Sequence, residues 1–310
     1  MGKKCIVLFS NGLDSRLAVK IMQEQGFEVI AIYFKFPFGA GCISPDKEVK
    51  KFCKENKVEL KVFNCTKGNY LKRYLKVIKE PVFGWGKSLN PCIDCRLFIF
   101  KYVKKYADKN KINLIVSGEV LNERPMSQHS KALRIVEAES GLSGRLLRPL
   151  SAKLLEETNA EKRGLVNRED LFKIQGRQRK EQIQLAKKFQ IDFPSPAGGC
   201  LLCEKDLKKR FEFLVSRGIS EEEIKLIRIG RHFLINNQWI ILGKDEVENK
   251  LLSEFKGKLI VPIDLGPSAL VVGTNKVIND LEKKVQKLIK IFSKKGSLGE
   301  REKFRKEFGI

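Results

Sequence analysis

The run Ser10-Asn11-Gly12-Leu13-Asp14-Ser15 has the clearest chemical potential in this sequence, since it follows a short apolar stretch and precedes a helical pattern. A buried strand, a tight polar turn and a helix N-terminus form a phosphate site, because free backbone N–H groups point at the anion and the helix dipole adds positive charge. The hydroxyls of Ser10 and Ser15 would supply two more donors, and the carboxylate of Asp14 could hold Mg²⁺ on the phosphates. The alternative is an ordinary strand–turn–helix junction with a serine cap.

Two cysteine pairs carry the second chemical signal: Cys92-Ile93-Asp94-Cys95 follows Asn-Pro, and Cys200-Leu201-Leu202-Cys203 follows Gly-Gly. Two intervening residues let both sulfurs of a pair face one metal ion or cluster. The spacing leaves three alternatives open: a structural Zn²⁺ site with four sulfurs, a redox dithiol, or an iron–sulfur cluster on three cysteines that leaves one iron open to sulfide. The other cysteines are interpreted as structural: Cys5, Cys42, Cys53 and Cys65.

Positive charge dominates the composition, with 61 Lys and Arg against 37 Asp and Glu and a formal net charge of +24. A positive field spread along the whole chain suits a polyanion such as RNA or DNA. A Lys-rich surface also arises from a thermophile's ion pairs or from genomic bias, but neither explains so large an imbalance. We therefore expect a nucleic-acid partner.

Length and apolar content limit the class of protein. The 310 residues, of which 42% are hydrophobic, suffice for one large domain and one or two small ones. Nothing near the N-terminus resembles a signal peptide, and no apolar run reaches membrane-spanning length. We therefore expect a cytoplasmic protein with no membrane partner, in which eight cysteines indicate metal or sulfur chemistry before disulfides.

The first half of the chain alternates between strand and helix patterns. This order predicts an α/β fold with a Rossmann-like parallel sheet and helices on both faces. Ligands of such sheets bind outside the carboxyl ends of the strands, which is where the 10–15 loop falls. The expected strands are 5–9, 27–34, 59–63 and 113–117, and the expected helices are 14–25, 45–56, 70–79 and 94–105.

The second half changes character past residue 205. Before that point, a basic helix is expected to open at Gly176 and run to about Phe189, and a Pro- and Gly-rich turn delivers Cys200. We expect three parts: 1–204 with the loop and the cysteines, a small α+β domain over 205–275, and a basic helical tail over 276–310 that frays at its end. The expected elements beyond 205 are helices 206–216, 221–227 and 246–254, hairpin 232–242 and strand 258–262.

The 10–15 loop resembles the Ser-Gly-Gly-x-Asp-Ser loop of the PP-loop ATP pyrophosphatases, whose fold is of the adenine nucleotide alpha hydrolase type. Asn11 stands where that family usually has its first glycine, and Asn tolerates the left-handed backbone region better than other non-glycine residues. Further motifs resemble the tRNA thiouridine synthetases of the 4-thiouridine synthetase and 2-thiouridylase types, over about residues 1–205. These motifs are Asn90-Pro91-Cys92-Ile93-Asp94-Cys95, Ser117-Gly118-Glu119-Val120 and Pro196-Ala197-Gly198-Gly199-Cys200.

The resemblance implies ATP-dependent thiolation of tRNA, in which a uridine carbonyl is adenylated and its oxygen is replaced by sulfur to give 4-thiouridine or 2-thiouridine. It implies a [4Fe–4S] cluster on Cys92, Cys95 and Cys200, while Cys203 could be a fourth ligand, a sulfur carrier or a bystander. Asp14 and Cys200 are the expected catalytic residues, and the sulfur donor is a small species, sulfide or persulfide. The residues expected to bind ATP are Ser10, Asn11, Gly12, Leu13, Asp14 and Ser15, with Phe34 and Gly118 framing the adenosine.

Two alternatives from other classes stay open. The chain could be a PP-loop amide-forming ligase that acts on a small carboxylate and binds structural Zn²⁺, although its charge argues against this. It could instead be a cluster-bearing desulfidase or binding module that does not use ATP, a doubt that Asn11 raises. Residues 205–275 loosely resemble the small RNA-associated domain of ribosome-quality-control proteins. A homodimer is compatible with these features, which do not determine the oligomeric state.

Overall fold

The computed structural model describes the chain except for residues 1–2, 39–45, 196–199, 275–278 and 295. Cys42 and the expected turn before Cys200 lie outside the described residues. The chain divides into two compact units, Met1–Lys205 and Asp206–Ile310, which are described separately.

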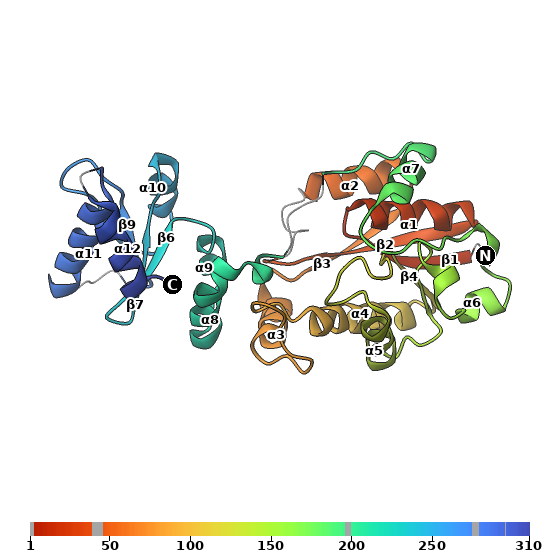
Figure 1. Cartoon of the computed structure of the whole chain (residues 1–310). Coiled ribbons are helices and arrows are strands. Elements are labelled where there is room, and N and C mark those ends of the chain that lie inside the picture. Colours follow the sequence, from red (N-terminus) through yellow and green to blue (C-terminus); the bar gives the residue numbers. More distant parts are fainter. Residues whose placement is uncertain (1–2, 39–45, 196–199, 275–278, 295) are drawn as a thin grey trace. The chain divides into compact units, whose positions relative to one another are not determined.

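A five-stranded sheet in the order β3-β2-β1-β4-β5 forms the centre of the first unit (Figure 1). All four neighbouring pairs are parallel, which confirms the predicted Rossmann-like class. The central strands read as continuous apolar runs because helices cover both of their faces. The strands are β1 (Lys3–Leu8), β2 (Phe27–Lys35), β3 (Glu59–Asn64), β4 (Leu114–Ser117) and β5 (Leu146–Leu147).

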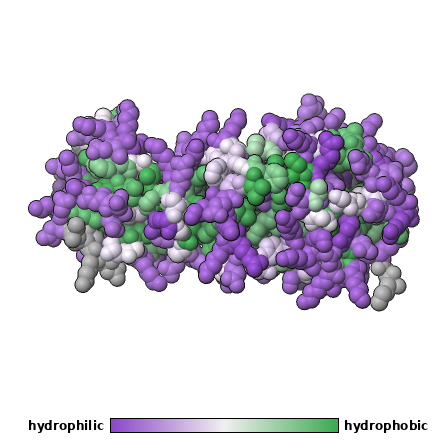
Figure 2. Space-filling view, turned by 90° about the horizontal axis from the view of Figure 1, so that it is seen from below, coloured by the Kyte–Doolittle hydropathy of each residue, from purple (hydrophilic) through white to green (hydrophobic). Residues whose placement is uncertain are grey.

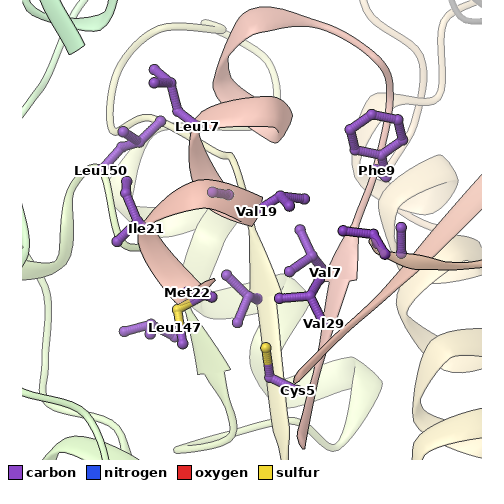
Figure 3. Close-up of a cluster of buried hydrophobic side chains, with 14 of the residues drawn as sticks. Cys5, Val7, Phe9, Leu17, Val19, Ile21, Met22, Val29, Leu147 and Leu150 are labelled. Atoms are coloured by element: carbon purple, nitrogen blue, oxygen red, sulfur yellow. The ribbon is translucent and has the colours of Figure 1, made fainter. Parts of the chain in front are cut away.

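Helices cover the two faces of this sheet in two layers (Figure 1). One layer consists of α1 (Leu13–Glu24), α2 (Asp46–Glu55) and α7 (Lys180–Lys188). The other consists of α3 (Gly68–Lys79), α4 (Cys92–Lys109) and α5 (Ser130–Ser140). On the α1 side, buried side chains of β1, α1 and the strand ends pack into one apolar core (Figure 3). This packing fixes the start of α1 at the end of β1, where the predicted loop lies.

The basic helix α7 begins later than the sequence pattern predicts. It starts at Lys180 and not at Gly176, because Gly176 and Arg179 have φ values of 81° and 54°, which a right-handed helix does not accept. The backbone N–H of Gly176 donates to the carbonyl of Leu121 at 2.8 Å. This bond holds the segment before α7 beside the loop that follows β4.

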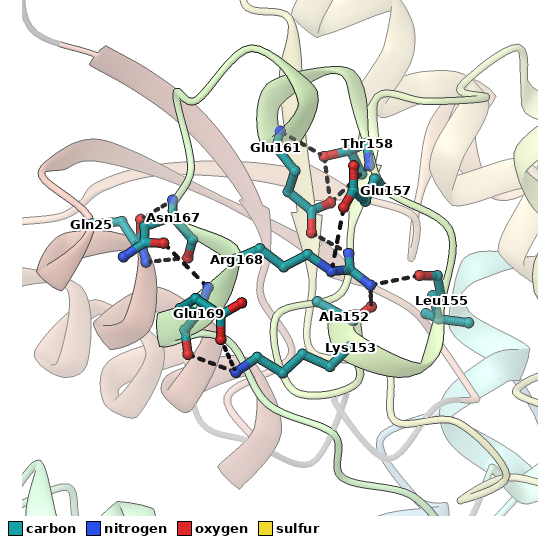
Figure 4. Close-up of polar contacts among 10 residues, drawn as sticks. All are labelled: Gln25, Ala152, Lys153, Leu155, Glu157, Thr158, Glu161, Asn167, Arg168 and Glu169. Carbon is teal, nitrogen blue, oxygen red and sulfur yellow. Dashed lines mark hydrogen bonds and ion pairs between the residues drawn. The ribbon is translucent and has the colours of Figure 1, made fainter.

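The segment between β5 and α7 has only short helices, and side chains hold it together (Figure 4). The Arg168 guanidinium donates to the carbonyls of Ala152 and Leu155 at 2.8 and 2.9 Å and pairs with Glu161 at 2.5 Å. The side chain of Gln25, the C-cap residue of α1, exchanges two hydrogen bonds with the Asn167 backbone, so the segment is fixed to the end of α1. The short helices are η2 (Ala152–Leu154), α6 (Asn159–Lys162) and η3 (Arg168–Asp170).

The second unit contains a four-stranded antiparallel sheet in the order β6-β7-β9-β8. The predicted hairpin turns at Asn236 and Asn237, whose φ values are 50° and 58°. Its strands are β6 (Arg231–Ile235), β7 (Gln238–Leu242), β8 (Gly257–Ile260) and β9 (Ala269–Val272). Its helices are α8 (Lys208–Arg217), α9 (Glu221–Leu226), α10 (Glu246–Leu252), α11 (Asn279–Phe292) and α12 (Leu298–Phe308).

The C-terminal helices are part of this second unit. Apolar side chains of α11, among them Val285 and Leu288, are buried in the same core as the sheet, and Phe304 and Phe308 of α12 pack against it. The end of the chain is thus helical, where the sequence suggested fraying. Strand β9 has no counterpart among the predicted elements.

Hydrophilic side chains cover most of the face that Figure 2 shows, as the charge balance predicts. Within the described residues, no helix is both long enough and apolar enough to cross a lipid bilayer.

Candidate functional site: an uncapped loop beside four cysteines

The 10–15 loop connects the end of β1 to the first turn of α1. The helix N-cap is Gly12, and no side chain caps it, so the serine-capped junction is not what forms. The hydroxyl of Ser15 accepts from the backbone N–H of Ser10 at 3.2 Å and donates to the carbonyl of Gly12 at 2.9 Å. The loop therefore closes on itself while no side chain of the N-cap residue covers the first N–H groups of the helix, which suits an incoming anion.

Asn11 adopts the left-handed conformation that its position requires, with φ at 67°. Its side chain is fully buried, and its Oδ1 accepts from Arg16 Nη2 at 2.7 Å while its carbonyl accepts from Arg16 Nε at 3.1 Å. The Arg16 guanidinium also lies over the Phe52 ring, 4.8 Å from its centre. Arg16 thus anchors the residue that replaces glycine, a partnership that sequence spacing did not reveal.

Asp14 lies in surroundings that oppose its ionisation. Burial raises the pKa of this carboxyl, and the nearby guanidinium groups of Arg179 and Arg124 offset part of the rise. One carboxylate oxygen, Oδ1, is buried and has no hydrogen-bond partner among the described residues. Glu123 lies close enough that the Asp14 charge, after burial, raises its pKa as well. An orphaned oxygen beside a second carboxylate fits a divalent cation such as Mg²⁺.

Helix α7 brings two polar side chains to this loop that the sequence analysis missed. α7 packs against α1, and Arg179 at its N-cap carries a buried Nε without a hydrogen-bond partner in the described structure. Gln182 is only 1% exposed and lies close enough to Asp14 to help lower the pKa of its carboxyl, but neither of its polar side-chain atoms makes a hydrogen bond of regular geometry in the described structure. Buried polar atoms that lack partners are rare in folded proteins and indicate a missing ligand or water. The unusual backbone at Arg179 leaves no signal in the sequence.

Gly118 lies where the chain leaves β4 and passes the loop. A Cβ atom on it would lie 2.6 Å from the carbonyl carbon of Asp14 and 2.7 Å from the backbone nitrogen of Ser15. Only glycine allows so close an approach. Gly118, which is expected to frame the adenosine, thus lies against the 10–15 loop.

Phe34 lies in a different environment from the expected one. It is 7% exposed and stacks on Phe63, with ring centres 4.9 Å apart and planes at 11°. Phe36 also stacks on Phe34, with ring centres 5.8 Å apart. The ring is therefore a core residue of the aromatic cluster against α3 and α4, which corrects the expectation that it frames an adenosine.

The two cysteine pairs, distant in sequence, meet in the first unit. The backbone N–H of Leu89 donates to the carbonyl of Leu202 at 3.2 Å, so the segment before Cys92 runs beside the segment of the second pair. Cys92 opens α4, where Asn90 Nδ2 donates to its sulfur at 3.2 Å. Cys200 donates from its sulfur to the carbonyl of Phe38 at 3.3 Å.

The four thiols shift one another's pKa values through hydrogen bonds and electrostatic interactions. Hydrogen bonding from Cys200 lowers the pKa of Cys203 to about 6, with further help from Arg124 and Cys92, whereas the pKa of Cys200 is raised by the same bond. Burial raises the pKa of Cys95 to about 11. Cys203, the exposed thiol of the second pair, is therefore the one that ionises first.

Four thiols at one place form a donor set that fits Zn²⁺ or an iron–sulfur cluster by chemistry. Over the described parts of the chain, however, no group of three or more Cys, His, Asp or Glu side chains is arranged so that it could hold a metal ion. Asp94, between the two cysteines, has a structural role: its carboxylate accepts from the backbone N–H groups of Val82 and Phe83 at 2.8 and 3.0 Å. Cys5, Cys53 and Cys65 are buried, as expected for structural cysteines.

A cavity of about 380 Å³ lies elsewhere in the first unit, between α5 and the segment around α6. Its lining includes Arg134, Glu137 and Lys162 but none of the loop or cysteine residues.

Comparison with known proteins matches residues 3–141 to a family model described as the tRNA methyl transferase HUP domain. A tRNA-specific 2-thiouridylase of Nitratiruptor sp. is 29% identical over 120 residues, which are 38% of this chain and 35% of that protein. A 7-cyano-7-deazaguanine synthase of Sulfurovum sp. is 43% identical over 54 residues, 17% of this chain and 22% of that protein. The chain thus spans about a third or less of the length of these curated relatives.

Two solved structures overlap more of the chain at lower identity. A U34-tRNA thiolase from Methanococcus maripaludis with its [4Fe–4S] cluster is 19% identical, with a TM-score of 0.36 over 70% of this chain and 71% of that one. A 4-thiouridine synthetase in complex with RNA and ATP is 16% identical, with a TM-score of 0.39 over 73% of this chain and 52% of that one.

The family match coincides with the structural features that surround the loop. It begins in β1, includes the 10–15 loop and the first cysteine pair, and ends just after α5. Four of the five parallel strands, β1 to β4, and the uncapped loop at the end of β1 belong to this matched segment, whereas β5 lies beyond it. Residues 3–141, which include the loop and the first cysteine pair, are thus similar to the tRNA methyl transferase HUP domain.

Proposed function

We propose that this protein is an ATP-dependent tRNA thiolase, which activates a uridine carbonyl with ATP and replaces its oxygen by sulfur. The observation that carries the proposal is that the uncapped nucleotide loop and the four thiols occupy one neighbourhood. Arg124 acts on the pKa of Asp14 at the loop and on those of Cys92 and Cys203 in the thiol group. A reaction in two stages on one bound base needs this proximity.

The loop would bind the ATP phosphates. The free N–H groups of α1 and the Ser10 hydroxyl would hold the anion, and the positive groups of Arg124 and Arg179 lie near enough to oppose charge that develops on pyrophosphate. Asp14 would hold Mg²⁺, which supplies further neutralisation of the phosphates when bound. The uridine oxygen attacks the α-phosphorus, the bond to pyrophosphate breaks, and the base carries AMP as a leaving group.

The thiol group would supply the sulfur side of the site. Cys92, Cys95 and Cys200 would hold a [4Fe–4S] cluster, which offers an iron position open to sulfide when bound. Hydrosulfide then attacks the activated carbon, a C–S bond forms, the C–O bond to AMP breaks, and the proton of the hydrosulfide passes to solvent. No oxidant or reductant enters this balance when the donor is sulfide.

The substrate proposal agrees with charge and with relatives. The net charge of +24 suits tRNA better than a small carboxylate. Several curated relatives of the matched segment are tRNA-specific 2-thiouridylases, although the chain spans only 35% and 41% of the length of two of them.

The test is pyrophosphate release by anaerobically purified protein supplied with Mg²⁺–ATP, sulfide and unmodified tRNA. We expect release that depends on tRNA. Release that needs a small carboxylate and ignores tRNA would show an amide-forming ligase instead. Iron, sulfide and zinc analysis of the same preparation separates the cluster from structural zinc.

A further inference from the structure

Glu119, two residues beyond the end of β4, is a buried carboxylate with partners on three sides. It is 2% exposed, and its Oε2 accepts from Ser117 Oγ at 3.0 Å and from Arg148 Nε at 2.9 Å. Its other oxygen, Oε1, lies 3.4 Å from Arg96 Nη1. Burial alone would raise the pKa of this carboxyl, but Arg96 and Arg148 outweigh burial and lower it, so Glu119 is ionised at neutral pH.

The partners of Glu119 belong to two different parts of the proposed site. Arg96 directly follows Cys95 in α4, the helix that carries the first pair of thiols. On the other side, the backbone of Gly118 rests against Asp14 and Ser15 at a distance that leaves no room for a Cβ atom. Residues 118–119 therefore contact the nucleotide loop with their backbone and the thiol helix with a side chain.

We propose that Glu119 is a positioning residue that keeps the thiols of α4 in register with the nucleotide loop, an inference that rests on the function proposed above. Gly118 rests on the loop, and the ion pair between Glu119 and Arg96 fixes α4 relative to Gly118, because a buried charge holds its partner in one arrangement. Loss of this pair uncouples the two halves of the reaction. Uridine is still activated by ATP, but the activated base meets sulfur less often and is hydrolysed instead.

The structure offers a matched control. Glu137 of α5 also forms an ion pair with Arg148, but the Glu137 side chain is 26% exposed. This ion pair does not involve Arg96 or another residue of α4. Glu137→Gln therefore removes a carboxylate from the same arginine and leaves the Arg96–Glu119 pair in place. Arg96→Gln and Glu119→Gln each remove that pair, and only Glu119→Gln keeps the Arg96 charge that lowers the pKa of Cys92 and Cys95.

The experiment measures pyrophosphate released per thiouridine formed in the full-length variants. We expect Arg96→Gln and Glu119→Gln to raise this ratio about tenfold while KM for ATP stays within about twofold, since nucleotide contacts are unchanged. The double variant should be no worse than the worse single variant, because both lose one interaction. Arg96→Lys should recover part of the coupling, and Glu137→Gln should keep the wild-type ratio.

A second measurement does not need turnover. In the full-length protein without metal, bound ATP should slow alkylation of Cys92 by iodoacetamide, as followed by mass spectrometry. We expect Arg96→Gln and Glu119→Gln to lose this protection at unchanged ATP affinity. Arg96 is 25% exposed, so its variant should fold even where Glu119→Gln does not.

Equal losses of pyrophosphate release and thiolation, additive effects in the double variant, or a Glu137→Gln phenotype like that of Glu119→Gln would each overturn the inference. Wild-type protein that shows ATP protection but forms no thiouridine would contradict the proposed function and leave the coupling in place. Thiolation without any ATP protection of Cys92 would contradict the coupling and leave the proposed function in place.

Discussion

Asp14 illustrates at the residue scale how a functional group can act against the stability of the fold. Its carboxyl is buried beside Glu123, and burial raises its pKa despite Arg179 and Arg124. A carboxyl whose folded pKa exceeds its unfolded value contributes stability below the unfolded pKa, and this contribution is lost as pH rises through the folded pKa. At neutral pH the ionised group is therefore a cost to the fold, which a bound cation would remove.

The substitution Asp14→Asn tests this reading. It removes the charge and keeps the shape, so we expect ATP-dependent pyrophosphate release to fall by about a hundredfold or more, because a cation ligand is lost. The melting temperature should stay unchanged or rise at pH 7. Calorimetry and a pyrophosphate assay on the same preparation check both parts. Full turnover in the variant would remove Asp14 from the mechanism.

The four cysteines are expected to differ in their contribution to metal binding. Each of three variants should lose most of the bound iron and the visible absorption, because each lacks one thiolate ligand of the proposed cluster: Cys92→Ala, Cys95→Ala and Cys200→Ala. Cys203→Ala should retain most of both and serves as the matched control. Metal analysis and spectra after anaerobic purification provide the measurement. Stoichiometric zinc with no iron would establish the structural-zinc alternative.

At the scale of elements, the succession of strand and helix patterns was enough to predict four of the five parallel strands and five of the six long helices that the structure describes in the first unit. Helix α5 (Ser130–Ser140) was not predicted. The pattern works because buried parallel strands are continuous apolar runs. Strand β5 consists only of Leu146–Leu147 and is too short to show a pattern. Helix α7 starts later than predicted because Arg179 has a left-handed backbone conformation, which the sequence does not indicate.

The candidate site was predictable only in its motifs. The 10–15 run and the cysteine spacing are local features, so the sequence displays them. The partners that surround these motifs come from distant segments, namely Arg16 on Asn11, α7 on the loop and Glu119 between β4 and α4. The fold creates such contacts, and no spacing rule identifies them. The apolar end of β2 suggested a nucleotide contact at Phe34, where aromatic stacking actually buries the ring.

The contact between β4 and the loop gives an element-scale prediction. Gly118→Ala would place a methyl group 2.6 Å from the Asp14 backbone, so β4 and α1 must separate. We expect a loss of about 1–3 kcal/mol in the free energy of unfolding and at least about a tenfold weaker affinity for ATP. Denaturant titration and ATP binding by calorimetry measure the two effects.

Gly299→Ala is the control for this variant. A Cβ atom at Gly299 meets nothing within 4 Å, and the residue lies within α12, where Ala favours a helix. Wild-type ATP affinity in Gly118→Ala would mean that this close approach does not shape the nucleotide site.

At the scale of the whole molecule, charge and division into units bear on the partner. The two units have separate apolar cores, so removal of residues 206–310 should leave the first unit folded. We expect this truncation to weaken tRNA binding more than ATP binding, because the loop and the cysteines precede the cut. Fluorescence anisotropy with labelled tRNA measures the first affinity, and calorimetry the second. Unchanged tRNA affinity would show that the second unit is not the RNA anchor.

Salt should distinguish phosphate contacts from base contacts in the intact protein. A chain with six phosphate contacts would lose about a thousandfold in tRNA affinity between low and moderate salt. A flat salt dependence would contradict a charge-driven partner and would favour a small substrate.

In the proposed reaction, one chain couples the cleavage of ATP to AMP and pyrophosphate with the exchange of oxygen for sulfur in a tRNA uridine. The most direct test incubates anaerobic protein with Mg²⁺–ATP, isotopically labelled sulfide and unmodified tRNA, then digests the tRNA and analyses its nucleosides by mass spectrometry. We expect labelled thiouridine whose formation requires both ATP and the intact 10–15 loop. Absence of thiouridine from iron-loaded protein that binds both ATP and tRNA would contradict the proposed reaction.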